Sequence, residues 1–160
     1  MRLQIIAVGK LKDGPERQLY ARYAERIGGA GRGVALGPLE LAEINESRAA
    51  GAVARMADEA GRLLGKARDA NVRVLLDERG KAVSSQAFAD ILRSFRDRPA
   101  SSLAFLVGGP DGHGQSARDA ADLVLSLGPM TLPHGLARIV LVEQIYRAIT
   151  ILAGHPYHRA

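Results

Sequence analysis

The sequence contains no cysteine, so disulfide bonds and thiolate metal sites are excluded. It also lacks any run of about 18 apolar residues, which excludes a membrane-spanning helix. The short apolar segment at residues 3–8 is followed at once by Gly9-Lys10, which indicates a buried strand rather than a secretion signal. These absences favour a cytoplasmic protein, because a chain without cysteine is compatible with a reducing compartment.

The composition is that of one ordinary globular domain. The chain has 160 residues, of which 47% are hydrophobic and 24% are charged, so we expect a single domain over residues 1–160. Its formal net charge is +5, from 22 Lys and Arg against 17 Asp and Glu. This excess favours a polyanionic partner such as RNA. Many globular proteins are also mildly basic, so the charge alone does not decide.

Apolar runs alternate with amphipathic stretches along the chain, which predicts an α/β fold. Because the apolar runs are continuous, the sheet should be mostly parallel, with helices on both faces. The expected strands are residues 3–8, 34–41, 72–76, 103–107 and 123–127. The expected helices are residues 15–27, 47–68, a segment that begins at Ser84 or Ser85 and includes Phe95, 117–122 and 139–152.

Local signals set the expected ends of these elements. Pro15 suits the first turn of a helix, and Gly28-Gly29 should end that helix. Ser47 is the expected N-cap of the second helix. Residues 77–80 should form a turn after the third strand, and residues 128–136, which contain two prolines, should form a loop.

Loops rich in glycine or polar residues follow three of the apolar runs, at residues 76–80, 108–112 and 128–134. The carboxyl ends of parallel strands share one edge of the sheet, so we expect these loops to gather there and hold a ligand. The glycines at 108, 109 and 112 permit close approach of a ligand to the backbone, and a plain tight turn explains them equally well. Neither a phosphate-binding P-loop nor a dinucleotide fingerprint is present.

The C-terminal segment, residues 154–160, is unusually rich in functional side chains. It contains two histidines, a tyrosine and an arginine within His155-Pro156-Tyr157-His158-Arg159. No acidic or cysteine ligand lies nearby in sequence, so we expect no metal site. Tyr and His stack on unpaired bases and Arg holds phosphates, which favours contact with RNA. The alternatives are a tail that packs on its own domain and a remnant of an expression tag.

These segments together resemble one family, the large-subunit ribosomal RNA methyltransferase H family, within the SPOUT class of knotted methyltransferases. The resemblance covers essentially the whole chain, and the combination of its motifs is more specific than any one of them. The matching segments are residues 3–10, Leu76-Asp77-Glu78-Arg79-Gly80, Leu106-Val107-Gly108-Gly109-Pro110-Asp111-Gly112, residues 125–127, Met130-Thr131-Leu132-Pro133-His134, Tyr146-Arg147-Ala148 and the tail 155–159.

The resemblance implies both a fold and an activity. Similar proteins are homodimers with the active site at the subunit interface, and their α/β fold carries a trefoil knot near the C-terminus. They use S-adenosylmethionine to methylate N3 of a pseudouridine in helix 69 of large-subunit rRNA, acting on the assembled ribosome. No membrane and no metal is implied.

The resemblance also implies the cofactor-binding residues. Apolar walls around the adenine are expected from Leu76, Leu127, Met130 and Leu132, and a polar contact from Thr131, with Gly108, Gly109, Gly128 and Pro129 completing the set. Gly128-Pro129 departs from the serine-rich segment of many relatives, and Pro129 removes one backbone N–H donor.

For the chemistry, the resemblance points to the tail and to the last helix. His158 is the expected proton acceptor, and Arg159 or Arg147 would stabilise the imide anion. Glu143 would orient Arg147 at a spacing of four residues, although a simple helix ion pair fits the same spacing. Tyr157 would stack on the target base. His134 is expected to close the loop structurally.

Three alternatives stay open at this stage. A SPOUT methyltransferase with another RNA target would share the fold, although the tail argues against it. A non-catalytic ribosome-binding factor that retains the fold would not take up S-adenosylmethionine. An ordinary nucleotide-binding α/β domain is disfavoured by the missing phosphate motifs.

Overall fold

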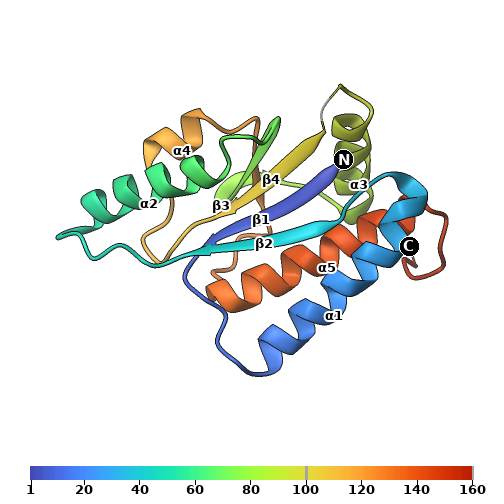
Figure 1. Ribbon diagram of the computed structural model, residues 1–160, viewed down its shortest axis with the longest axis horizontal. Helices are drawn as coiled ribbons and strands as arrows, with labels where there is room; N and C mark the ends of the chain where they lie inside the picture. The colour runs from blue at the N-terminus through green and yellow to red at the C-terminus, as the bar shows by residue number, and fades with distance from the viewer. Residues whose placement is uncertain (100, 160) are drawn as a thin grey trace.

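The computed structural model describes residues 1–99 and 101–159, so Ala160 at the end of the predicted tail lies outside it. The chain forms three layers, with a five-stranded sheet between two layers of helices (Figure 1). Every strand pairs in parallel with its neighbours, in the order β2-β1-β4-β3-β5. The predicted α/β fold with a mostly parallel sheet is therefore confirmed. The strands are β1 (Arg2–Val8), β2 (Leu39–Ile44), β3 (Val72–Ala82), β4 (Ser102–Val107) and β5 (Leu123–Ser126).

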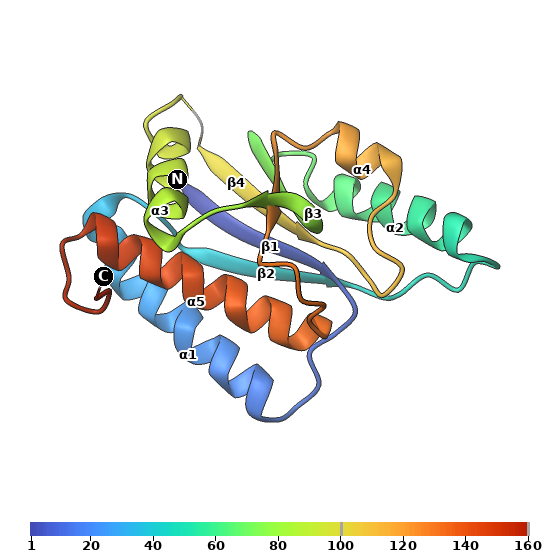
Figure 2. The ribbon, with the colours of Figure 1, turned by 180° about the vertical axis from the view of Figure 1, so that it is seen from behind.

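Helices cover both faces of the sheet, as the continuous apolar strands require. On one face lie α1 (Pro15–Ala30), α3 (Ser85–Arg96) and α5 (His134–Leu152), and on the other lie α2 (Ala52–Lys66) and α4 (Gln115–Asp119) (Figures 1 and 2). A short 3-10 helix, Gly31–Val34, follows α1. Within the described ranges, no helix has both the length and the apolar character needed to cross a membrane.

Alternation along the central strands divides the apolar side chains between two cores. In β1, Leu3 and Ile5 pack with α1, α3 and α5, while Ile6 and Val8 pack with α2 and α4. All six residues of β4 are buried, since this strand lies in the middle of the sheet. Side chains that alternate in direction from a pleated strand produce this division.

Several predicted boundaries are confirmed. The first and fourth strands lie within one residue of their predicted ranges, and Pro15 opens α1. Ser84 is the N-cap of α3, where its hydroxyl accepts a hydrogen bond from the Ala87 N–H at 3.2 Å. These elements carry strong local signals, because a buried apolar run and a capping hydroxyl act through neighbouring residues alone.

Other predicted boundaries are wrong. Helix α1 continues through Gly28-Gly29, since the first residue after the start of α1 with a positive φ is Ala35, which follows the 3-10 turn. Ser47 precedes α2 by several residues instead of capping it, and its hydroxyl accepts a hydrogen bond from Ala49 N–H. The second strand begins at Leu39 and not at Val34, because residues 31–34 still form the 3-10 helix.

The predicted turn at residues 77–80 is also wrong, because β3 continues to Ala82. The strand pairs with β5 in two registers, through Leu76 and again through Lys81, both opposite Leu125. Gly80 makes this possible, since a Cβ there would lie 2.6 Å from the Leu125 carbonyl carbon. Residues 77–80 therefore form an irregular segment within the strand, at the edge of the sheet where β4 ends.

Helix α5 begins at His134, earlier than predicted, and it contains a buried arginine that the sequence analysis missed. The Arg138 side chain is 1% exposed and forms an ion pair with Glu43 of β2 at 2.6 Å. It also donates hydrogen bonds to the carbonyl oxygens of Val8 and Gly9, at 2.8 and 2.7 Å. The first turns of α5 are thereby fixed to the ends of β1 and β2.

Replacing Arg138 by methionine should lower the free energy of unfolding by about 3–5 kcal/mol, because the partly buried Glu43 would lose its cation and the carbonyl oxygens of Val8 and Gly9 would lose a buried donor. Urea unfolding of both proteins measures this difference. The control is Arg68→Met, whose exposed partner Asp69 stays solvated, so the change should be below about 0.5 kcal/mol. Equal stabilities of the two variants would contradict the anchoring role of Arg138.

Candidate active site

A cavity of about 700 Å³ opens beside the irregular middle segment of β3 and the carboxyl ends of β4 and β5. Its wall contains parts of all three loops singled out from the sequence, so their predicted gathering at one sheet edge is confirmed. Among the predicted cofactor-binding residues, Pro129 does not line the cavity. The others do: Leu76, Gly108, Gly109, Leu127, Gly128, Met130, Thr131 and Leu132.

The glycine loop after β4 is a tight turn and a close-packed segment at once. The Gly112 N–H donates to the Gly109 carbonyl at 3.0 Å, and Gly112 has a φ of 86°, which favours glycine. A Cβ on Gly108 would lie 3.1 Å from the His113 ring, and one on Gly109 would lie 3.0 Å from a carboxylate oxygen of Glu59. The missing side chains thus let the loop pack against the protein itself while its backbone lines the cavity.

The surroundings of His113 and Asp77 in the cavity wall shift the pKa of each side chain. His113 is buried, and burial lowers its pKa, so the ring is neutral and its Nε2 donates to the Leu76 carbonyl at 3.0 Å. Burial opposes ionisation of Asp77, but hydrogen bonds from the Arg79 N–H and from Arg118 outweigh it and hold the pKa of Asp77 below its usual range. The cavity therefore has a neutral imidazole and a compensated carboxylate beside its apolar walls.

The residues present fit an adenosine-containing cofactor. Leu76, Leu127 and Leu132 supply apolar surface, and the loop at 108–112 supplies backbone polar groups where a Cβ would obstruct packing. The volume falls within the range of about 300–1,000 Å³ that is typical of small-molecule sites. Met130 is 80% exposed and Leu132 is 36% exposed, so one side of the cavity consists of apolar side chains open to solvent.

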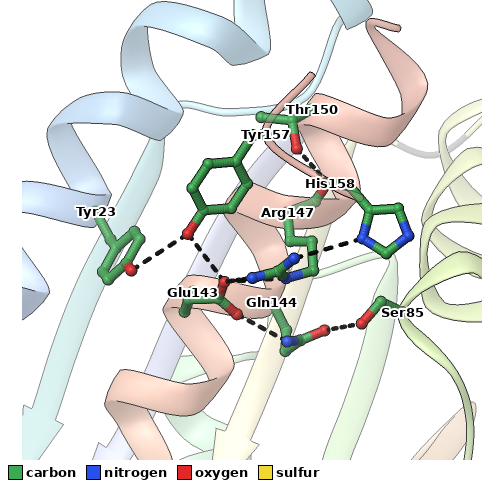
Figure 3. Close-up of polar contacts among 8 residues, drawn as sticks. All are labelled: Tyr23, Ser85, Glu143, Gln144, Arg147, Thr150, Tyr157 and His158. Carbon is green, nitrogen blue, oxygen red and sulfur yellow. Dashed lines mark hydrogen bonds and ion pairs between the residues drawn. The ribbon is translucent and has the colours of Figure 1, made fainter. Parts of the chain in front are cut away.

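The second group of predicted residues gathers around Glu143, on the later half of α5 (Figure 3). One oxygen of Glu143 accepts hydrogen bonds from Arg147, through Nε at 3.0 Å and Nη2 at 2.5 Å, and from the Tyr157 hydroxyl at 3.1 Å. Its other oxygen accepts from the Gln144 amide at 2.7 Å. Arg147 Nη1 also contacts His158 Nδ1 at 3.4 Å. The carboxylate thus connects the tail to the helix.

Aromatic packing surrounds this carboxylate. The Tyr157 ring packs edge-on against Tyr146 with centroids 4.8 Å apart, and the Arg147 guanidinium lies 4.9 Å from the Tyr157 centroid. Tyr23 of α1 lies 3.4 Å from Tyr157, hydroxyl to hydroxyl, and it is the donor because Tyr157 donates to Glu143. Burial and these hydrogen bonds raise the pKa of Tyr157, so the phenol stays protonated. Tyr23 was not among the site residues predicted from the sequence, because nothing in its spacing marks it as part of a site.

The tail packs on its own domain, the helix ion pair forms, and Arg159 stays outside the cluster. The tail does pack on its own domain, through Tyr157, and Glu143 and Arg147 do form a helix ion pair. Neither observation removes these side chains from a site, since His158 and Arg147 keep partly exposed surfaces. Arg159 is exposed and makes no hydrogen bond or ion pair with the residues described here.

The two groups use different parts of α5: the cavity is lined by His134 and Ala137 from its first turns, and the tail cluster contains Glu143 and Arg147 from its middle onward. Ala137 lines the cavity, and at about 1.5 Å per residue the helix rises about 15 Å from Ala137 to Arg147. A second cavity of about 340 Å³ lies beside the helix between them, with Leu127, Leu141 and Gln144 in its wall. Arg147 and the tail that it contacts therefore lie well away from the part of the first cavity's wall that α5 supplies.

Comparisons with known proteins identify the family of this chain. A family model described as a predicted SPOUT methyltransferase matches residues 1–158. The ribosomal RNA large subunit methyltransferase H of Sinorhizobium fredii is 52% identical over 160 residues, covering 100% of both chains. The protein of that name from Rhizobium leguminosarum is 51% identical over 159 residues, or 99% of each chain, and the one from Rhodopseudomonas palustris is 51% identical over 160 residues.

A solved structure supports the fold alone. A probable methylase family protein from Haemophilus influenzae superposes with a TM-score of 0.56 at 11% identity, covering 99% of this chain and 70% of that one. The family model and the full-length relatives carry the assignment. The chain belongs to the SPOUT methyltransferase family, and within it to the ribosomal RNA large subunit methyltransferase H group.

Proposed function

We propose that this protein transfers a methyl group from S-adenosylmethionine to large-subunit ribosomal RNA, at N3 of a pseudouridine in helix 69 of the assembled ribosome. The proposal depends on sequence identity: about half of all residues, over the full length, are identical to those of ribosomal RNA large subunit methyltransferase H proteins. The cavity at the sheet edge supports it, because its walls suit the methyl donor. Because the proposed substrate is the ribosome, the reaction would take place in the cytoplasm.

The residues of the cavity would hold the methyl donor. Leu76, Leu127 and Leu132 would cover the adenine, and backbone groups of the loops at 108–112 and 127–132 would bind its polar edge. When bound, S-adenosylmethionine supplies an electrophilic methyl group: N3 forms a bond to that carbon as the carbon–sulfur bond breaks, its electron pair stays on sulfur, and the N3 proton leaves to solvent. The protein has to align N3 and to stabilise the charge that develops on the base.

The tail cluster would bind the base. Arg147 remains a cation, because its hydrogen bonds to Glu143 raise its pKa further above the ordinary value. A fixed cation beside the imide stabilises negative charge on the ring oxygens. Tyr157 offers an aromatic face for stacking, and Arg159 is exposed where it can reach a phosphate. The formal charge of +5 adds a general attraction to RNA.

The separation along α5 favours a site shared by two copies of the chain. Because Arg147 lies about 15 Å along α5 from Ala137 of the cavity wall, we infer that the cluster of a partner subunit would align the base at this cavity. Apolar side chains support this homodimer, since Met130 and Leu132 are exposed in the wall of the first cavity and Leu136 is exposed in the first turn of α5. Exposed apolar groups of this kind mark contact surfaces.

A trefoil knot near the C-terminus is the remaining part of the proposal. The chain changes faces between α4, on the α2 side of the sheet, and α5, on the α1 side, and it does so beside the extended strand β3 (Figures 1 and 2). Pulling the two termini apart in a force experiment should give an extension shorter than the contour length of the chain, because a knot would tighten. Full extension would rule out the knot.

The first test of function locates the methyl group. Purified protein with labelled S-adenosylmethionine and ribosomes that lack this modification should place the label on N3 of the helix 69 pseudouridine, and protein-free RNA should be methylated far more slowly. Nuclease digestion and mass spectrometry identify the labelled nucleotide. Label elsewhere would indicate another RNA target. If the protein neither transfers label nor binds S-adenosylmethionine, the result would favour a non-catalytic ribosome-binding factor over an enzyme.

The shared site predicts complementation between two inactive variants. Leu132→Trp should fill the cavity and Arg147→Ala should remove the cation, so each variant alone should be inactive. A heterodimer purified through two different tags would contain one intact site, formed by the cavity of one chain and the tail of the other, and should recover about half of the wild-type activity. Sites confined to single chains would leave the heterodimer inactive, and light scattering of each variant controls for dimer formation.

A further inference from the structure

The contact between Arg147 and His158 determines which nitrogen of the histidine carries the proton. Arg147 Nη1 lies 3.4 Å from His158 Nδ1 (Figure 3). A guanidinium has only donors, so the nitrogen that it faces must offer a lone pair. In a neutral imidazole one nitrogen accepts and the other carries the hydrogen. The single proton of neutral His158 is therefore on Nε2, which faces away from the arginine.

Glu143 fixes which nitrogen of Arg147 faces His158. Both Nε and Nη2 of Arg147 donate to the same carboxylate oxygen, and this forked pair fixes the plane of the guanidinium. Nη1 is the nitrogen left to face the tail. Moving the single hydrogen of the neutral ring to Nδ1 would break this hydrogen bond and point two N–H groups at each other across 3.4 Å. The geometry therefore selects one tautomer of the neutral imidazole.

We propose that His158 acts as a hydrogen-bond donor to the target base through Nε2–H and not as the acceptor of the N3 proton. Arg147 acts as the positioning residue that sets this tautomer, in addition to its own charge. The inference rests on the proposed methylation and assigns the histidine a role that differs from the one expected from the sequence. The His158 ring cannot accept the N3 proton in this form, because its Nε2 already carries a hydrogen and the lone pair of its Nδ1 is bound by Arg147.

The donor role suits the chemistry of an imide. When N3 loses its proton to solvent, negative charge spreads over the two ring oxygens beside it. An Nε2–H and a guanidinium N–H are donors of the kind that stabilise such oxygens, as in an oxyanion hole. His158 would therefore contribute through charge stabilisation and would have no proton to take up during the reaction.

A spectroscopic test does not depend on activity. The chain has four histidines, so ¹⁵N-labelled imidazoles are readily assigned by single substitutions. The nitrogen shifts of His158 should show the Nε2–H form in the wild type and a mixture of forms in Arg147→Met. His155 is the internal control, because its Nδ1 accepts from the Tyr157 backbone N–H at 3.1 Å and should not change. An Nδ1–H form in the wild type, or no change in Arg147→Met, would overturn the assignment.

Activity of three His158 variants supplies the second test. The amide of His158→Gln places an N–H donor near the position of Nε2 but has no basic nitrogen, whereas His158→Asn reaches only the position of Nδ1. His158→Gln should stay within about tenfold of wild type, while His158→Asn and His158→Ala should lose about 100-fold or more in kcat, with the affinity for S-adenosylmethionine unchanged.

The outcomes separate the two proposals. If His158→Gln is as inactive as His158→Ala, the histidine does not act as a donor. If the wild-type protein methylates no ribosomal substrate, the proposed function fails, while the nitrogen shifts still decide the tautomer.

Discussion

A single buried ion pair determines where the last helix sits, and the site depends on that helix. Arg138 has the largest fully buried side chain among the described residues, and it fixes the first turns of α5 to Glu43 and to the end of β1. The same turns supply His134 and Ala137 to the cavity wall, and the later half of the helix supplies Glu143 and Arg147. A shift of α5 would therefore displace both halves of the proposed site at once.

Helix α5 also keeps those halves apart. Because an α-helix is stiff and rises about 1.5 Å per residue, Arg147 of the tail cluster stays about 15 Å along the helix from Ala137 of the cavity wall. The exposed apolar residues near the cavity and the partly exposed tail are then understood as complementary parts of one site. In the proposed function, backbone groups and apolar walls would bind the methyl donor, and a fixed cation, an aromatic ring and an oriented imidazole would bind the base.

Much of this arrangement could be predicted from the sequence. The gathering of three loops followed from the geometry of a parallel sheet, and Glu143 with Arg147 followed from helical spacing. Arg138 could not be predicted in this way, because an arginine in an apolar helix signals burial only once its partner Glu43, far away in sequence, is known. The continuation of β3 past Leu76 depends on Gly80 packing against Leu125, which is also a distant contact. The tail was expected to contact RNA, and its packing against Tyr23 and Tyr146 depends on how α1 meets α5.

The central claim is that the cavity of one chain works with the tail of another, and cross-linking tests it most directly. The absence of native cysteine allows single cysteines to be placed at Met130, on the exposed rim of the cavity, and at His155, in the exposed tail. A short bifunctional thiol reagent should join a Met130→Cys chain to a co-purified His155→Cys chain and produce a covalent dimer. If that pair stays unlinked while a single chain that carries both cysteines is linked within itself, the site belongs to one chain and the account is wrong.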